Sequence, residues 1–335
     1  MRVTQQSTYR LLQTNLQRIN QQLQTLYNQG SSGSKLNVAS DDPTAVRPVL
    51  TTRSQLRSTD RYLETMGVTQ DKMQATDGQL ASIENILQRA KELGIQAVNS
   101  ALSSNDLNSI ADEIAELRSQ LLDSANATID GKYVFSGYQE NVKPFSANPN
   151  YDPAAYDPAD STTWPYTYNG DANPTQLEIS PDEYVTTTLT GNELFLGVSN
   201  ANWVNGQTAA SGPQPENNHV DIFSVMTRLE EAIRAGNVSD ENGPGGGILQ
   251  QNSNVDTAAN QERQLRSQMG ARAARVQSSM SYQQDVQVDL KQLLSRYQDT
   301  DVLDNYSAIV KQETALQAAL SITAKVSSIS ILDYL

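Results

Sequence analysis

The chain has 335 residues, of which 37% are hydrophobic and none is cysteine, and its formal net charge is −14. The lack of thiols excludes disulfides, cysteine catalysis and cysteine-ligated metals. The acidic balance disfavours nucleic acid and anionic membranes as partners, because both need clustered Lys and Arg. The mean hydropathy of −0.53 favours elongated helical bundles with thin cores over a thick globular core.

Apolar residues near the N-terminus recur at alternating steps of three and four, which is the spacing of a coiled-coil seam. The intervening residues are mainly Gln, Asn, Thr and Arg. The pattern therefore predicts a narrow apolar stripe on a polar helix, which we expect to end at Gly30. The seam consists of Tyr9, Leu12, Leu16, Ile19, Leu23 and Leu26.

The next segment, NQGSSGSKLNVASDDPTAV (28–46), predicts a joint between two helices. Its glycines permit turns, and its Ser and Asn side chains compete with helix formation. We expect the second helix to restart at Pro43, with Asp42 as its cap, because a carboxylate accepts from free backbone amides and proline suits the first turn. Asp41 and Asp42 could instead bind a cation, but adjacent carboxylates point different ways, so capping is favoured.

Helical patterns continue through residues 43–128. Pro48 is close enough to the expected start to be tolerated, or it marks a kink. The seam over residues 80–101 ends in small residues, which would let a neighbouring helix approach closely. LSSNDL (102–107) predicts a turn and a new cap, followed by a helix whose apolar positions are Ile110, Ile114, Leu117 and Leu121.

The composition changes from residue 130 onwards. Residues 141–215 hold most of the prolines and both tryptophans, and QLEISPDEYVTTTL (176–189) has strand-forming composition with partial alternation. This region predicts a small β-rich domain inserted into a helical frame.

Helical spacing returns with Phe223, Met226, Leu229 and Ile233, and AGNVSDENGPGGG (235–247) interrupts it. A long seam over 265–297 then predicts the longest helix. After a weak break at 298–306, a last seam supplies Ala315, Ala319, Ile322, Val326 and Ile329.

No combination of residues predicts catalysis, a metal site or a cofactor site. His219 is the only histidine and lacks the partners of a triad or a zinc site. GPGGGI (243–248) lacks the Lys-Ser/Thr of a nucleotide loop and predicts a hinge. The carboxylates of YDPAAYDPAD (151–160) could pair as in a glycosidase, but a Pro-rich acidic loop favours solvated side chains. Aromatic residues that could stack on sugars, although internal packing is favoured, are Tyr151, Tyr156, Trp164, Tyr166 and Tyr168.

The predicted fold is mainly α, an elongated bundle built from N- and C-terminal halves, with a small β-rich domain in the middle and mobile terminal coiled-coil helices. The expected parts are an N-terminal assembly helix and joint (1–42), two halves of a helical domain (43–140 and 216–300), an inserted β domain (141–215) and a C-terminal assembly helix (301–335).

The two ends are too thin to be stable alone, because five aliphatic seam residues offset only part of the cost of ordering a helix. We therefore expect both ends to be mobile in the free monomer and to become helical when many copies pack together. The positions expected to carry assembly are Leu12, Leu16, Ile19, Leu23, Leu26, Ile322, Val326 and Ile329.

Four segments resemble a known family. Terminal heptad helices around a variable middle, with SDDPTA (40–45) and LQRAKELGIQAVNSALSSNDLNSIADEIAEL (87–117), are similar to bacterial flagellin and its relatives. Within that superfamily, GKYVFSGYQENVKPF (131–145) and SISILDYL (328–335) resemble the family of flagellar hook-associated protein 3, the hook–filament junction protein. The resemblance covers residues 1–145 and 255–335 and leaves 146–254 unmatched.

The resemblance implies a non-enzymatic protein of the flagellum, outside the cell, exported through the flagellar type III channel without a cleaved signal. It implies self-association in a ring between hook-associated protein 1 and flagellin, and a cytoplasmic export chaperone at the C-terminal helix. The start of the chain, which lacks a long apolar block, agrees with this expectation. The outer helices (43–128 and 255–300) would contact neighbours, and the β domain would face outwards.

Two alternatives stay open on the sequence. One is a flagellin filament subunit, which belongs to the same class but occupies another position in the organelle. The other is an exported adhesin or glycan-binding protein that uses the central β domain.

Overall fold

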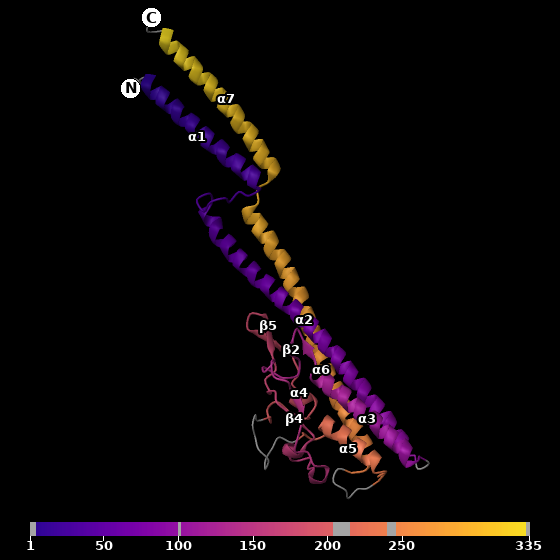
Figure 1. The fold of residues 1–335 in the computed structure, drawn as a ribbon. Helices are drawn as coiled ribbons and strands as arrows, with labels where there is room; N and C mark the ends of the chain where they lie inside the picture. The colour runs from indigo at the N-terminus through magenta and orange to yellow at the C-terminus, as the bar shows by residue number, and fades with distance from the viewer. Residues whose placement is uncertain (1–4, 100–101, 204–214, 240–245, 333–335) are drawn as a thin grey trace. The chain divides into compact units, whose positions relative to one another are not determined.

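The structure, a computed structural model, describes residues 5–99, 102–203, 215–239 and 246–332 (Figure 1). The chain folds into two compact units. Unit 1 comprises Met1–Arg61 and Gln283–Leu335, and unit 2 comprises Tyr62–Tyr282. Unit 1 therefore combines the two ends of the chain, whereas unit 2 is one continuous segment. Two long helices, α2 (Pro43–Ala97) and α6 (Ile248–Gln298), contribute residues to both units.

Unit 1 pairs the first and last helices of the chain, α1 (Gln5–Ser32) and α7 (Val302–Leu332). The expected end of α1 at Gly30 is wrong, since the helix continues to Ser32. Gly33 follows with a φ of +68°, a left-handed conformation that glycine adopts at little cost and that ends helices. Helix α2 runs without interruption through Pro48, so the proline is tolerated within the helix.

Unit 2 is a helical bundle that contains α3 (Ser104–Ala125), α5 (Ile222–Arg234) and parts of α2 and α6. Ser103 and Asp106 form a reciprocal capping box at the start of α3, as the sequence LSSNDL indicates. The helices approach closely where α2 meets α6, because a Cβ at Gly94 would lie only 1.9 Å from Asn252 Oδ1. The buried seams that form the core include Leu80, Ile83, Leu87, Ile114, Leu121, Leu229, Ile233, Leu265, Met269 and Val276.

Strands in the middle of the chain pair only in twos. The antiparallel hairpins are β1 (Thr128–Ile129) with β2 (Lys132–Tyr133), β3 (Phe145–Ala147) with β4 (Tyr166–Tyr168), and β5 (Gln176–Ser180) with β6 (Glu183–Thr186). The short elements between and after them are η1 (Pro153–Ala155), η2 (Ser161–Thr163) and α4 (Gly191–Leu194). The described strands are two to five residues long, so they form local hairpins rather than one wide sheet.

Aromatic side chains join these hairpins to the helical bundle. The Phe145 ring packs against Phe195 and Phe223, with ring centroids 5.0 and 5.1 Å apart, and Tyr166 packs on Phe223 at 4.6 Å. Since Phe223 belongs to α5, the inserted region shares the core of unit 2.

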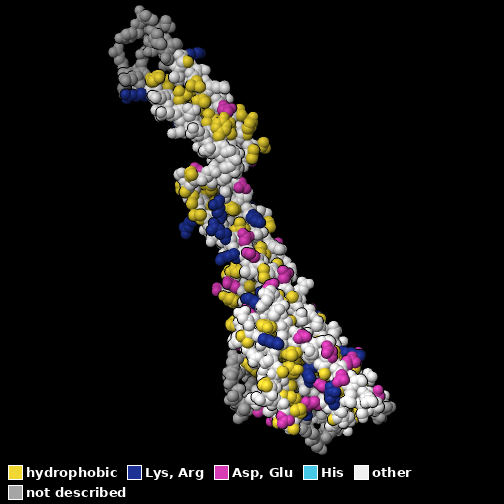
Figure 2. Space-filling view, in the orientation of Figure 1, with side chains coloured by type: hydrophobic (Ala, Val, Ile, Leu, Met, Phe, Trp, Pro, Cys, Tyr) yellow, Lys and Arg dark blue, Asp and Glu magenta, His cyan; other side chains and the backbone are white. Residues whose placement is uncertain are grey.

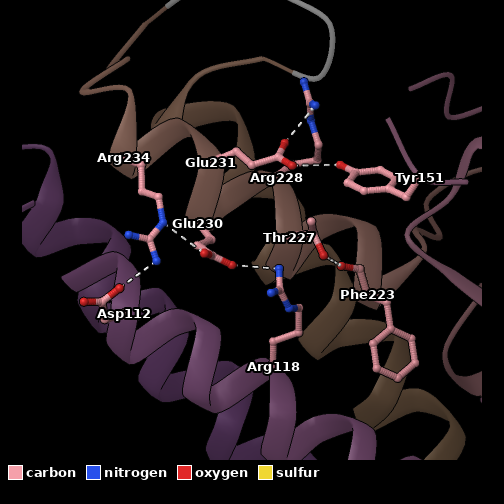
Figure 3. Close-up of polar contacts among 9 residues, drawn as sticks. All are labelled: Asp112, Arg118, Tyr151, Phe223, Thr227, Arg228, Glu230, Glu231 and Arg234. Atoms are coloured by element: carbon pink, nitrogen blue, oxygen red, sulfur yellow. Dashed lines mark hydrogen bonds and ion pairs between the residues drawn. The ribbon is translucent and has the colours of Figure 1, made fainter. Parts of the chain in front are cut away.

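Ion pairs hold α5 between α3 and the inserted region (Figure 3). Glu230 accepts from Arg118 of α3 at 2.7 Å and from Arg234 at 3.0 Å, and Arg234 also binds Asp112 at 2.6 Å. On another side of α5, Glu231 accepts from Tyr151 at 3.0 Å. Arg118 and Glu230 are mostly buried, so this pairing offsets part of the cost of burying their charges.

Candidate assembly surface

Apart from Tyr9, which is 55% exposed, the predicted N-terminal seam lies on the face of α1 that α7 covers. Leu23 is buried, and Leu12, Leu16, Ile19 and Leu26 are half-buried. A single partner helix therefore leaves the seam only partly covered. An open groove of about 500 Å³ beside Leu26 runs between the two helices.

Two polar contacts cross the helix pair. The Tyr27 hydroxyl donates to Glu313 Oε1 at 2.5 Å, and Gln312 Nε2 donates to Gln22 Oε1 at 2.5 Å. The hydrogen bond to Glu313 raises the pKa of the Tyr27 phenol above its usual value. These contacts help to fix the register of the pair.

Helix α7 turns toward α1 a face that shares Ala319 with the predicted C-terminal seam but not Ile322, whose part in assembly between copies stays a prediction. The partly buried positions include Ile309, Gln312, Leu316 and Ala319, whereas Ile322 is 52% exposed. The side chains of Val326 and Ile329 lie outside the described residues. The 4-3 spacing of α7 fits more than one register, because Ala, Leu and Ile occur on several of its faces.

A second apolar stripe on α7 is uncovered in the single chain. Leu303 is 81% exposed and Tyr306 67%, and Val310 continues the stripe at helical spacing. Leu320 lies on the same face beyond the polar positions Glu313 and Gln317. Figure 2 shows hydrophobic side chains along the visible face of the terminal helices. The sequence interpretation missed this stripe, although the same step pattern marks it. Burying such a stripe stabilises an assembly by roughly 1.5–3 kcal/mol per fully buried side chain.

One buried side chain weakens the α1–α7 pair. Asn305 of α7 is buried, and neither its Nδ2 nor its Oδ1 has a hydrogen-bond partner among the described residues. Gly30 of α1 lies opposite, where an added Cβ would be 3.2 Å from Asn305 Oδ1. An unpartnered buried amide is destabilising, so the pair contains a polar defect at its core.

The joint before α2 is organised by two carboxylates. Asp42 Oδ1 accepts from the backbone N–H groups of Thr44 at 3.0 Å and Ala45 at 3.2 Å, at the start of α2. The hydrogen bonds from Thr44 hold the pKa of Asp42 below its usual value. Asp41 Oδ2 instead accepts from the N–H groups of Asn37 and Val38. Both carboxylates thus bind backbone, and no cluster of three or more potential metal ligands occurs among the described residues.

The same joint is tied to the break between α6 and α7. Lys35 N donates to Gln298 O at 2.8 Å, and Thr300 N donates to Gly33 O at 3.0 Å, on either side of the Ser34–Asp299 bridge. Lys35 Nζ adds a bond to Arg296 O at 2.7 Å. The two chain connections therefore lie side by side.

The acidic and aromatic residues of unit 2 that the sequence offers for catalysis or sugar binding take part in local structure. Asp152, Asp157 and Asp160 each accept from a backbone N–H two residues on, so they stabilise turns. Trp164 is buried, and the Arg228 guanidinium lies over the ring of Tyr156.

A recess of about 400 Å³ beside these residues is lined in part by His219 and Asp221. Asp221 is buried and caps α5, accepting from the N–H groups of Phe223 and Ser224 at 3.1 Å, and burial raises its pKa to about 7. Residues 243–245, half of the GPGGGI segment, lie outside the described residues. Among the described helices, none combines the length and apolarity needed to cross a bilayer.

Two protein-family models match the chain, one at each end. The model of the bacterial flagellin N-terminal helical region matches residues 3–140, and that of the C-terminal helical region matches 253–335. The chain belongs to the bacterial flagellin family. The matched segments contain α1, α2, α3 and α7 and nearly all of α6. Most of the inserted region and α5 fall between the two family models.

Individual relatives differ in how much of the chain they match. Flagellar hook-associated protein 3 of Escherichia coli (strain K12) is 24% identical over 308 residues, which is 90% of each chain. A flagellin of Salmonella dublin is 31% identical, but over only 118 residues, 35% of this chain and 23% of the flagellin. The solved structure of a flagellar hook-associated protein from Vibrio parahaemolyticus has the same fold, with a TM-score of 0.59 at 12% identity over 77% of this chain and all of that one.

Proposed function

We propose that this chain is a structural subunit of the bacterial flagellum that forms the junction between hook and filament and has no catalytic role. The observation that carries the proposal is the extent of the match. Hook-associated protein 3 aligns with 90% of the chain, including the middle region, whereas flagellin aligns with 35%. A shared middle region favours the junction protein over a filament subunit, because the terminal helices alone are common to the whole family.

The terminal helices carry assembly in this proposal. Sister copies pack around the α1–α7 pair and cover both the half-exposed seam of α1 and the second stripe of α7, with the inserted region outside. The assembly positions are Leu12, Leu16, Ile19, Leu23, Leu26, Leu303, Tyr306, Val310, Leu320, Ile322, Val326 and Ile329.

The proposed partners follow from the position in the organelle. The ring joins hook-associated protein 1 on one side and flagellin on the other. Before export without a cleaved signal, a cytoplasmic chaperone covers the C-terminal helix, whose exposed stripe would otherwise associate with other apolar surfaces. The final location is outside the cell.

Aspartates in the α1 seam provide the test. Leu16→Asp with Leu23→Asp places two charges on the covered face, so cells that carry only this variant should have hooks without filaments and shed flagellin into the medium. Gln17→Asp with Gln24→Asp adds the same charge to exposed positions of the same helix and should leave the cells motile.

Electron microscopy, motility and immunodetection of flagellin are the measurements. Circular dichroism should show that unit 2 of the purified seam variant melts as in the unmodified chain. Motile cells with the seam variant would exclude these positions from assembly. Polymerisation of the purified chain into long filaments would instead identify a flagellin, since we expect the chain to stay monomeric.

A further inference from the structure

Positive charge is concentrated at the start of the chain, although the protein as a whole is acidic. The first 40 residues contain no Asp or Glu. Between residues 43 and 61, α2 contains four arginines and a single acidic residue, Asp60. Figure 2 shows Lys and Arg side chains gathered over this part of the molecule.

These arginines form a basic stripe on one face of α2. The stripe, defined as Arg47, Leu50, Ser54, Arg57 and Arg61, repeats at steps of three and four, so its members share one face of the helix. The three arginines are exposed, and Leu50 is 60% exposed at the centre. Arg61 also contacts Ser58 Oγ at 3.3 Å. Within the described part of unit 1, neither Arg47 nor Arg57 forms an ion pair.

Helix α6 has a stripe of opposite charge in the same unit. This acidic stripe consists of Asp285, Val288 and Asp289, with Val288 51% exposed and both aspartates at the surface. Neither aspartate forms an ion pair within the described ranges. Gln283, two residues earlier, is buried, so the acidic stripe lies on the other side of α6. Lys291, two residues after Asp289, is the next charged residue along α6, and its Nζ donates to Gln287 Oε1 at 3.0 Å.

Contacts between the two helices place the stripes at the same level. Gln287 Nε2 donates to Asp60 Oδ1 at 2.6 Å, and Arg53 Nη2 donates to Gln298 Oε1 at 2.8 Å, so α2 and α6 run antiparallel. The Asp60–Gln287 contact places Arg61 and Arg57 opposite residues 286 and 290 of α6, one residue from Asp285 and Asp289. The Arg53–Gln298 contact, between two long side chains, shifts this register by four residues. Each pair is four residues apart, which corresponds to about 6 Å along a helix.

We propose that the basic stripe of one copy docks on the acidic stripe of the next copy around the junction ring. The occupant is a second copy of this chain, because it offers the opposite charge at the matching height and spacing, with an exposed aliphatic residue in each stripe. Two different surfaces meet, so the contact is heterologous and repeats around a closed ring. Exposed ion pairs are individually weak, and the stripes set the orientation of neighbours more than their affinity. The inference rests on the proposed function.

Chemical cross-linking in isolated flagella tests the contact directly. The chain has no cysteine, so Arg61→Cys with Asp285→Cys gives two defined thiols per copy. A short bismaleimide should produce a ladder of covalent oligomers from the double variant, and no species larger than a dimer from either single variant. Arg61→Cys with Glu116→Cys, whose second cysteine is on α3, should give no ladder. Cross-links only to other flagellar proteins, or none, would overturn the inference.

Charge exchange tests whether complementarity matters. Arg57→Asp with Arg61→Asp, and separately Asp285→Arg with Asp289→Arg, should each cause loss of attached filaments. The combined variant should restore them, because the stripes are complementary again. If the unmodified chain occupies the junction and every charge variant attaches filaments normally, the stripe contact is wrong and the proposed function stands. If the unmodified chain is missing from isolated flagella, the proposed function itself fails.

Discussion

Glu262 shows how a single residue can depend on helix packing. Its carboxylate is fully buried, and neither oxygen has a hydrogen-bond partner among the described residues. Arg266, one turn further along α6, instead binds Asp77 at 2.7 Å and Glu84 at 2.9 Å, both from α2. Burial, with a further contribution from the nearby Glu84, raises the pKa of Glu262 to about 7.

Glu262→Gln should therefore reduce the pH dependence of stability. Because the folded pKa lies above the ordinary value near 4.5, the stabilising contribution of the protonated form is complete below that value and is lost as the pH rises through about 7. At pH 8 the variant should be more stable than the unmodified chain, by on the order of 2 kcal/mol. At pH 4.5 the two should be similar.

Urea unfolding followed by circular dichroism at both pH values measures the difference. Glu116→Gln, on the exposed face of α3, is the matched control and should change neither value. Some pH dependence should persist in the Glu262 variant, because burial also raises the pKa of Asp221 to about 7. Equal stability of the variant and the unmodified chain at pH 8 would contradict the prediction.

Capping residues are predictable from the sequence, and buried charges are not. Asp42 and Ser103 precede their helices by a fixed number of residues, so local spacing reveals them. Glu262 lies in the polar stretch AANQERQLR, which is typical of a solvated helix surface. The approach of α2, nearly two hundred residues away, brings Glu84 and Asp77 near it, and local spacing does not reveal such a contact.

At the scale of elements, α7 shows why a correct pattern can give an incomplete interface. Heptad spacing predicts a helix whatever its register, but the partner decides which stripe is covered. In the single chain α1 covers the face containing Leu316, and the stripe containing Leu303 stays open. The hairpins depend on local turns and are visible in the sequence, whereas their packing through Phe145 onto α5 is a long-range contact.

Asn305→Leu should strengthen the α1–α7 pair. The change replaces an unpartnered amide with an apolar group of similar size, which should stabilise the pair by about 1–2 kcal/mol. We expect backbone amides at residues 5–28 to exchange rapidly with solvent in the unmodified monomer. In the variant they should exchange roughly 5- to 30-fold more slowly.

Hydrogen exchange of a confirmed monomer, read by mass spectrometry, is the measurement. Ser307→Leu, at an exposed position of α7, is the control and should not slow exchange. Strong protection of residues 5–28 in the unmodified monomer would contradict the expected mobility of the ends. An unchanged rate in the Asn305 variant would show that the buried amide does not weaken the pair.

At the scale of the whole molecule, we expect unit 2 to fold without unit 1. Its core joins α2, α3, α5, α6 and the aromatic residues of the hairpins, and the chain within it is continuous. A fragment spanning Tyr62–Tyr282 should be monomeric and helical, and should unfold cooperatively within a few degrees of the main transition of the full chain. Thermal unfolding followed by circular dichroism tests this, and a fragment with no cooperative transition would contradict it.

The paired connections within unit 1 have a mechanical consequence. A helix pair attached by one flexible strand could swivel freely about it. Here two backbone connections, between α1 and α2 and between α6 and α7, run side by side. The hydrogen bonds of Lys35 and Thr300 join them. Torque on one side of the connections must therefore load both of them at once. In a rotating appendage, two joined connections of this kind would permit bending while resisting rotation of the helix pair about its own axis.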